Sequence, residues 1–179
     1  DQFKQLTDDP NELFIVLDIA FSYAWRKIDY PFLDQSLVKQ LPTFQHVRVS
    51  LFLAPHIPDE YQKLHIGQLI NTNWPYKPVV DHLMSFYFLI NPLQMAKILF
   101  DAISIAGPCI DKVVDKPIEV DFDTIFPLIL ICVLATGIIN EPQILYYVAK
   151  VGQDYQDDSI VQLGSSYAEP IITHLSGSN

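Results

Sequence analysis

The chain has 179 residues, of which half are hydrophobic and only 18% are charged, and its formal net charge is −10. So apolar a composition excludes a disordered chain, and the length is that of a single soluble domain with a sizeable core. Two cysteines exclude a disulfide-stapled scaffold or a Cys-rich zinc module. The acidic balance repels phosphate groups, so we expect neither nucleic-acid binding nor an anionic membrane footprint.

The first predicted element is an amphipathic helix over residues 11–29. Apolar residues recur there at helical spacing, Asp9-Pro10 is a typical helix start, and Pro31 ends the pattern. The next stretch, 43–54, is ambiguous because its apolar residues alternate as in a strand. We interpret it as helical, since no nearby segment with a similar alternation offers it a partner strand.

The middle of the chain is punctuated by prolines and asparagines, which separate short helical patterns. The pattern predicts a short helix over 59–69, a loop over 71–75, a helix over 77–90, a helix from Asn91-Pro92 to about Ala106, and a connector over 107–123. These assignments give the first two thirds of the chain a helical character throughout.

The longest uncharged run covers residues 125–139 and is too short to span a bilayer, which takes about 20 residues. It contains Pro127 and Gly137, and neither end carries a Lys/Arg cluster. We therefore predict a helix over 124–137 that is buried on all sides. A helix over 142–152, an acidic loop over 153–158 and a last helix over 159–175 follow. About eight helices with short connections predict an all-α layered domain.

Residues suited to covalent catalysis or to metal binding are not grouped in the sequence. The five histidines lack metal-ligand spacing, and we interpret His82, beside Asp81, as a packed, hydrogen-bonded imidazole. No GxSxG, GxxxxGK[ST] or GxGxxG motif occurs. We thus expect no hydrolase or transferase chemistry, no cofactor and no metal. Cys109 and Cys132 stand in apolar surroundings, which indicates reduced core thiols and a cytoplasmic protein.

One segment, VDFDTIFPLILICVLATGIINEPQILYYV, resembles the central motif of VPS9 domains, the exchange-factor modules that act on small GTPases of the Rab5 group. Asp123 and Pro127 match the acid and the proline of that motif, residues 140–142 match its loop, and Tyr147-Val148 matches its aromatic-aliphatic step. Segments 90–107 and 157–175 are similar to the helices before and after the motif. The resemblance covers about 90–175, while residues 1–89 match only in being helical.

The resemblance implies a specific role for Asp123. In the family this acid reaches into the GTPase nucleotide site, competes with Mg²⁺ and the β-phosphate for a lysine, and loosens GDP. Asp123 is then the candidate acidic finger, Pro127 keeps the helix end rigid, and Asp121 and Thr124 flank the finger in the GTPase-binding surface. The partner would be a small GTPase of the Rab5 group, met in the cytoplasm by a domain that other parts or partners recruit to endosomal membranes.

The chain departs from the family at two binding positions. The second acid that commonly follows the finger is Thr124 here, and a tyrosine/threonine pair in the last helix is replaced by Ile160 and Leu163. Sliding the match by a few residues offers Gly164 or Ser165 instead. Aliphatic residues still bury area, but they lose polar specificity. The sequence therefore also fits a degenerate VPS9-fold interaction or autoregulatory module without exchange activity.

A purely structural interpretation of the same residues stays open. Asp123 could cap the helix start, with Thr124 as the alternative N-cap, and the chain could be a helical structural domain. A GTPase-facing Asp123 should reach solvent, and its helix should neighbour the helix that begins near Ser159. For organisation, we expect an N-terminal helical part over 1–89 and a VPS9-like core over 90–179, joined in one compact unit.

Overall fold

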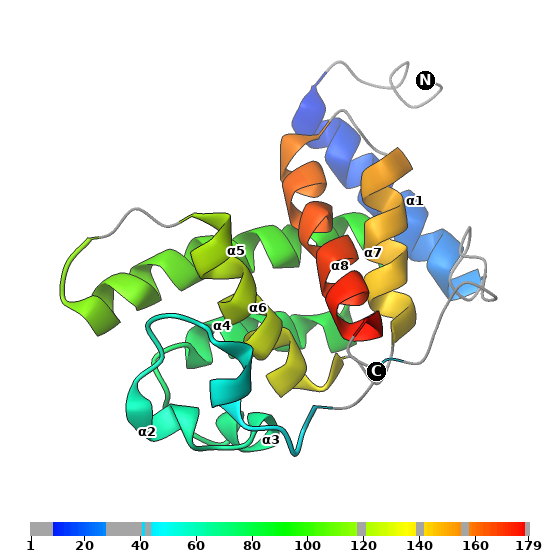
Figure 1. Cartoon of the computed structure of the whole chain (residues 1–179). Helices are drawn as coiled ribbons and strands as arrows, with labels where there is room; N and C mark the ends of the chain where they lie inside the picture. Colours follow the sequence, from blue (N-terminus) through cyan, green and yellow to red (C-terminus); the bar gives the residue numbers. More distant parts are fainter. Residues whose placement is uncertain are drawn as a thin grey trace.

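The computed structural model describes residues 9–27, 41, 44–117, 121–138, 142–154 and 158–177. Within these ranges the chain forms eight α-helices and no strand, which confirms the predicted all-α class (Figure 1). The elements are α1 (Pro10–Lys27), the 3₁₀ helix η3 (Val49–Phe52), α2 (Asp59–Gln62), α3 (Ile66–Leu69), α4 (Lys77–Leu83), the 3₁₀ helix η4 (Met84–Phe88), α5 (Pro92–Val114), α6 (Phe122–Thr136), α7 (Pro142–Asp154) and α8 (Ser159–Ser176).

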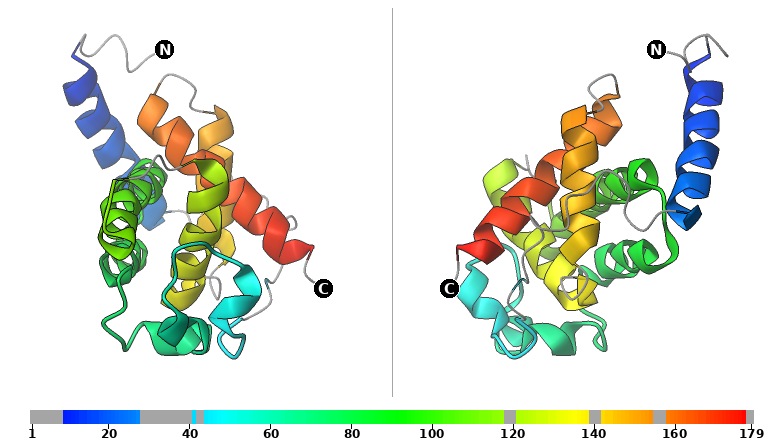
Figure 2. Two further views of the ribbon diagram at one scale, coloured as in Figure 1. Left: turned by 60° about the vertical axis from the view of Figure 1, so that its left-hand side comes forward. Right: turned by 90° about the vertical axis from the view of Figure 1, so that its right-hand side faces the viewer.

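The helices pack around α5 and α6. Helix α8 packs against both α5 and α7, and α4 packs against both α5 and α6. Helix α1 contacts α5 and stands at the outer edge of the molecule (Figure 2). One hydrophobic core draws buried residues from α1 and from α3 to α8. Residues on both sides of position 89 therefore contribute to the same core.

Helix α6 is buried on all sides over most of its length, as predicted. Every residue from 128 to 138 is buried, because α3, η3, α4 and α5 all pack against this helix. Gly137 ends it in a left-handed conformation with φ of 75°, which costs little at a residue without a side chain. The apolar run is thus a core helix whose exposed part is confined to its N-terminal end.

The interpretation of 43–54 as a helix is wrong for most of the described residues 44–54. Only Val49–Phe52 is helical, as one 3₁₀ turn, and Arg48 forms an isolated antiparallel bridge with His65. The N–H of Val49 donates to the carbonyl of Leu64 at 3.0 Å, and the N–H of Ile66 donates to that of Val47 at 2.9 Å. The alternating residues of 43–54 therefore do have a partner segment, the one around His65, although that segment shows no alternation.

The same bridge divides the helix predicted over 59–69 into the one-turn helices α2 and α3. His65 has an extended conformation there. Its N–H donates a hydrogen bond to the side-chain oxygen of Gln68 at 2.8 Å. An extended residue cannot continue a helix. The loop over 71–75 is found as predicted, and the helix over 77–90 is found as α4 followed by η4.

Helix α5 is longer than predicted. Asn91 caps it as expected, by accepting a 2.9 Å hydrogen bond from the N–H of Leu93, but the helix continues to Val114. Ala106, Cys109 and Ile110 are all buried, so the apolar spacing of the helix continues past Pro108. Part of the predicted connector is therefore helical.

Among the described helices, α5 alone is long and apolar enough to cross a membrane by length and composition, and 44% of its apolar window is buried inside the protein. The predicted start of α1 and the starts of α7 and α8 are confirmed. The predicted acidic loop begins later than expected, because Gln153 and Asp154 belong to α7. Pro31, residues 140–141 and residues 155–157 lie outside the described residues.

Candidate functional site

The N-terminal end of α6 contacts α8 through aromatic side chains. The ring of Phe122 stacks on that of Phe126, with 5.2 Å between the ring centroids and 18° between the ring planes. Both rings also meet the ring of Tyr167 in α8, with centroid distances of 5.1 Å and 6.4 Å. The two helices are therefore joined by an aromatic cluster of Phe122, Phe126 and Tyr167.

Asp123 lies in the first turn of α6 and its side chain is exposed. It takes part in no hydrogen bond or ion pair with any other residue that the structure describes. The proposal that Asp123 caps this helix is therefore wrong, and so is the alternative that Thr124 is the N-cap. Asp123 presents its carboxylate to solvent, and its helix neighbours α8.

Asp121 is the N-cap of α6. Its carboxylate accepts a 2.9 Å hydrogen bond from the N–H of Thr124, and its carbonyl accepts one of 3.1 Å from the N–H of Ile125. Hydrogen bonds from the side chain and the backbone of Thr124 lower the pKa of Asp121 from its ordinary value. Asp121 and Thr124 are thus engaged with each other at the helix start, although Asp121 itself is exposed.

Pro127 is half-buried and lies in the second turn of α6. The prediction placed it in the first turn, where no carbonyl needs its missing N–H. The helix begins at Phe122, so the carbonyl of Asp123, four residues before Pro127, already lies inside it. That carbonyl would accept the N–H of residue 127, but a proline has no N–H to donate. Pro127 therefore removes one helical hydrogen bond at the acidic residue itself.

The two aliphatic replacements lie on the exposed side of α8 near this junction. The side chains of Ile160 and Leu163 are 38% and 47% exposed, and that of Phe122 is 48% exposed. Residues 160, 163 and 167 follow helical spacing, so Ile160 and Leu163 continue the stripe of α8 that holds Tyr167. The stripe runs along α8 from Tyr167, which contacts Phe122, to Ile160, which lines a hollow shared with the start of α1. Asp158 caps α8 through hydrogen bonds of 2.8 Å and 3.1 Å from the N–H groups of Ile160 and Val161.

Gly164, which was assigned to the GTPase-binding surface, is buried against α5 instead. A Cβ at Gly164 would lie 1.8 Å from the carbonyl oxygen of Ala96, so the two helix backbones touch there. Ser165 is buried as well, and its hydroxyl donates to the carbonyl of Val161 at 2.7 Å. Neither of the shifted alternatives therefore reaches the surface.

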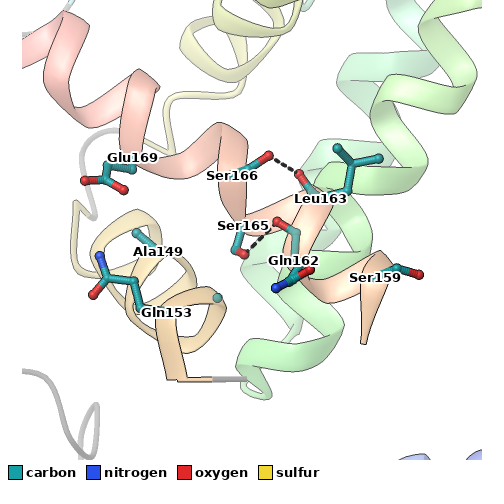
Figure 3. A pocket seen from close by; sticks show the side chains of 9 residues that line it. Ala149, Gln153, Ser159, Gln162, Leu163, Ser165, Ser166 and Glu169 are labelled. Atoms are coloured by element: carbon teal, nitrogen blue, oxygen red, sulfur yellow. Dashed lines mark hydrogen bonds between the residues drawn. The ribbon is translucent and has the colours of Figure 1, made fainter. Parts of the chain in front are cut away.

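Two open hollows flank the exposed side of α8. The first, of about 430 Å³, lies between α7 and α8, and Figure 3 shows its polar lining, including Gln153, Gln162, Ser166 and Glu169. The hydroxyl of Ser166 donates to the carbonyl of Leu163 at 2.7 Å (Figure 3). The second, of about 570 Å³, adjoins the aromatic cluster and is lined by residues that include Phe126, Pro170 and His174.

The chemistry of this region is that of a contact surface. Among the described residues no group of three His, Cys, Asp or Glu side chains is placed to hold a metal ion. His82 is packed near Asp101, with 3.8 Å between Nε2 and Oδ2, and it lacks the hydrogen bond expected of it among the described residues. What the surface offers among the described residues is an exposed carboxylate without a partner, that of Asp123, next to the half-exposed ring of Phe122.

Sequence reasoning missed the aromatic cluster. Phe122 and Phe126 are four residues apart at a predicted helix start, a spacing that places both rings on one face. That spacing was the available signal for Phe122, which directly precedes the acidic residue. Tyr167 gave no such signal, because only the packing of α8 beside α6 brings its ring to them.

Comparison of the chain with protein-family models, with curated proteins and with solved structures gave no match. The resemblance to VPS9 domains therefore rests on the quoted residues alone.

Proposed function

We propose that this chain is a VPS9-like domain that binds a small GTPase of the Rab5 group and accelerates the release of its GDP. The observation that supports this most is the environment of Asp123. Its carboxylate is exposed at the start of α6, it is not used as the helix cap, and the helix that carries it packs against α8. Among the described residues its side chain has no partner, so the carboxylate is available to a binding partner.

The proposed mechanism is electrostatic. The Asp123 carboxylate enters the nucleotide site of the GTPase and takes the place of phosphate charge beside the lysine that holds it. An anion placed in a site built for phosphate competes with the nucleotide without any covalent step. GDP, with its Mg²⁺, is then held less tightly and dissociates faster.

The apolar stripe beside Asp123 supplies the docking area in this proposal. Phe122, Ile160 and Leu163 are large, apolar and exposed, and burying apolar surface contributes about 25 cal/mol per Å². Such contacts discriminate between partners less than hydrogen bonds do. The domain would meet its GTPase in the cytoplasm, and other parts or partners would recruit it to endosomal membranes.

Release of fluorescent GDP from a panel of Rab5-group GTPases tests the proposal. The chain should accelerate release from at least one of them, and both Asp123→Ala and Asp123→Asn should abolish the acceleration while the melting temperature stays unchanged, because Asp123 makes no described contact. Glu60→Ala is the matched control, since Glu60 is also an exposed acid in the first turn of a helix. Absence of acceleration across the whole panel would refute the proposal.

A second candidate function is a docking module that keeps GTPase binding but not exchange. The aliphatic Ile160 and Leu163 favour it, because they offer contact area where the family has a hydrogen-bonding pair. In that case the chain should bind a GTPase of the panel without changing GDP release, and Leu163→Asp should weaken the binding. Acceleration that depends on Asp123 would exclude this candidate.

A further inference from the structure

The turn of α6 that carries Asp123 has fewer helical hydrogen bonds than an ordinary helix start. The first N–H groups of any helix lack partners within the helix. Here Pro127 also leaves the carbonyl of Asp123 without its helical donor. The backbone at Asp123 therefore depends on contacts from its immediate neighbours.

Interactions of two neighbouring residues hold this turn in place. On one side, the side chain of Asp121 accepts the N–H of Thr124 at 2.9 Å, which closes the first turn around Asp123. On the other side, the ring of Phe122 lies 5.1 Å from the ring of Tyr167 and ties the turn to α8. In the sequence, Asp123 therefore lies between Phe122, whose ring is anchored to α8, and Thr124, whose N–H binds the capping residue Asp121.

We infer that Asp121 is a positioning residue for Asp123, which acts by capping α6 and does not itself contact the GTPase. This inference rests on the proposed exchange function. It assigns Asp121 a role through hydrogen bonding, whereas a residue that contacted the GTPase or repelled its phosphates would act through its negative charge. The two roles make different demands on the side chain.

Substitutions of Asp121 distinguish the effect of its capping hydrogen bond from the effect of its negative charge. Asparagine and serine cap helices about as well as aspartate, whereas alanine does not. Asp121→Asn and Asp121→Ser should keep the maximal rate of GDP release within about twofold of the unmodified chain, and Asp121→Ala should lower it about fivefold. The concentration of the domain that gives half the maximal rate should stay unchanged in all three, because the docking surface is intact.

Asp9→Ala is the matched control for losing a cap. Asp9 accepts the N–H of Asn11 at 2.8 Å at the start of α1, a helix that contacts α5. This variant should lose comparable stability while the release of GDP stays unchanged. Amide hydrogen exchange adds a readout besides activity, since the Thr124 amide should exchange faster in Asp121→Ala and stay protected in Asp121→Asn.

The outcomes distinguish this inference from the proposed function. If Asp121→Asn and Asp121→Ser lose as much activity as Asp121→Ala, the charge matters and the inference is overturned while the proposed function stands. If Asp121→Ala does not fold, the Asn and Ser variants still decide, because full activity in both supports the cap and loss in both refutes it. An unmodified chain that accelerates release from no GTPase of the group overturns both.

Discussion

Two carboxylates at the start of α6 have different roles although only one residue separates them. Asp121 is held by Thr124, while Asp123 extends into solvent. The difference follows from helix geometry, because the N-cap side chain points back at the free N–H groups and a side chain of the first turn points outward. Asp121, which is hydrogen-bonded, is suited to stabilise the helix start, and Asp123, which extends into solvent, is suited to contact a partner.

The hydrogen bonds of Asp121 predict a pH dependence of stability. Because the pKa of Asp121 is lowered from 3.8 in the folded chain, the unfolded chain takes up a proton more readily. The stability from this group is therefore present above its ordinary pKa and is lost as the pH falls through the lowered value. Asp121→Asn keeps the cap without a titrating group.

Thermal melts from neutral pH down to about 3 check this prediction. Near neutral pH the difference in melting temperature between the unmodified chain and Asp121→Asn should be constant. At the acid end the melting temperature of the unmodified chain should fall relative to that of Asp121→Asn. A difference that stays constant over the whole range would show that Asp121 gains no hydrogen bond on folding.

At the scale of elements, α8 is held by close backbone contacts on two sides. Gly164 lets its backbone touch α5 at Ala96, and Gly152 of α7 leaves room for the side chain of Ser165. These contacts determine which face of α8 is buried. The remaining face presents Ile160 and Leu163 beside the aromatic cluster, so small residues on one side of the helix define the surface on the other.

Gly164→Ala should therefore be strongly destabilising. The new methyl group would lie 1.8 Å from a backbone oxygen that cannot move aside without displacing α5. We expect a loss of at least about 2 kcal/mol in the free energy of unfolding, measured by urea denaturation. Gly107→Ala is the control, because nothing lies within 4 Å of its added Cβ, and this variant should gain up to about 1 kcal/mol from helix propensity.

A buried asparagine ties α1 to α5. The side chain of Asn91 accepts the N–H of Leu93 and donates to the carbonyl of Asp18 at 3.0 Å, and Asn91 is completely buried. Asn91→Ala removes these bonds and a further one to the carboxylate of Asp18, and leaves buried groups unpaired, which should cost about 1–3 kcal/mol. Urea denaturation measures the loss. The exposed loop residue Asn73 provides a control variant, Asn73→Ala, that should change the stability by less than about 0.5 kcal/mol.

At the scale of the whole molecule, a single core unites the helices, and its cysteines report on its integrity. Cys132 is fully buried and Cys109 is nearly so, and both are free thiols. Burial raises the pKa of both thiols, and thiolate is the reactive form. Neither thiol should react with a disulfide reagent until the core opens.

Ellman's reagent tests this expectation under native conditions and in urea. Both thiols should stay unreactive in the native chain and become reactive together at the midpoint of unfolding seen by circular dichroism. Ser104→Cys places a thiol on the exposed side of α5 and should react at once. Reaction of Cys109 well before the midpoint would show that its part of α5 opens separately from the rest of the core.

Local signals accounted for most elements. The Asn91 cap, the asparagine-rich loop over 71–75 and the apolar run of α6 were each readable because the residues that determine them are close in sequence. The errors came from distant partners. Arg48 and His65 form a bridge that limits one predicted helix to one 3₁₀ turn and divides another. The alternation over 43–54 was visible, but the segment around His65 has no such pattern, so the partner could not be identified from the sequence.

The same division holds at the candidate site. The residues around Asp123 and Pro127 that carry the resemblance were visible in the sequence, and so were Ile160 and Leu163. The sequence could not show that Asp121, not Asp123 or Thr124, is the cap, because any of the three residue types can take that position. Nor could it show that Gly164 faces α5, since the face of a helix that is buried depends on its neighbours.

The sequence by itself thus determined an all-α class, a helix apolar enough to be buried on every side, and an acidic residue at its start. These properties arise from composition, caps and periodicity, which act within a few residues. Only the tertiary structure decided that the start of this helix stays exposed, that Phe122 and Phe126 meet Tyr167, and that Ile160 and Leu163 stay exposed on α8. Those contacts join residues about 40 apart in the chain, and only the packing of α8 against its neighbours brings them together.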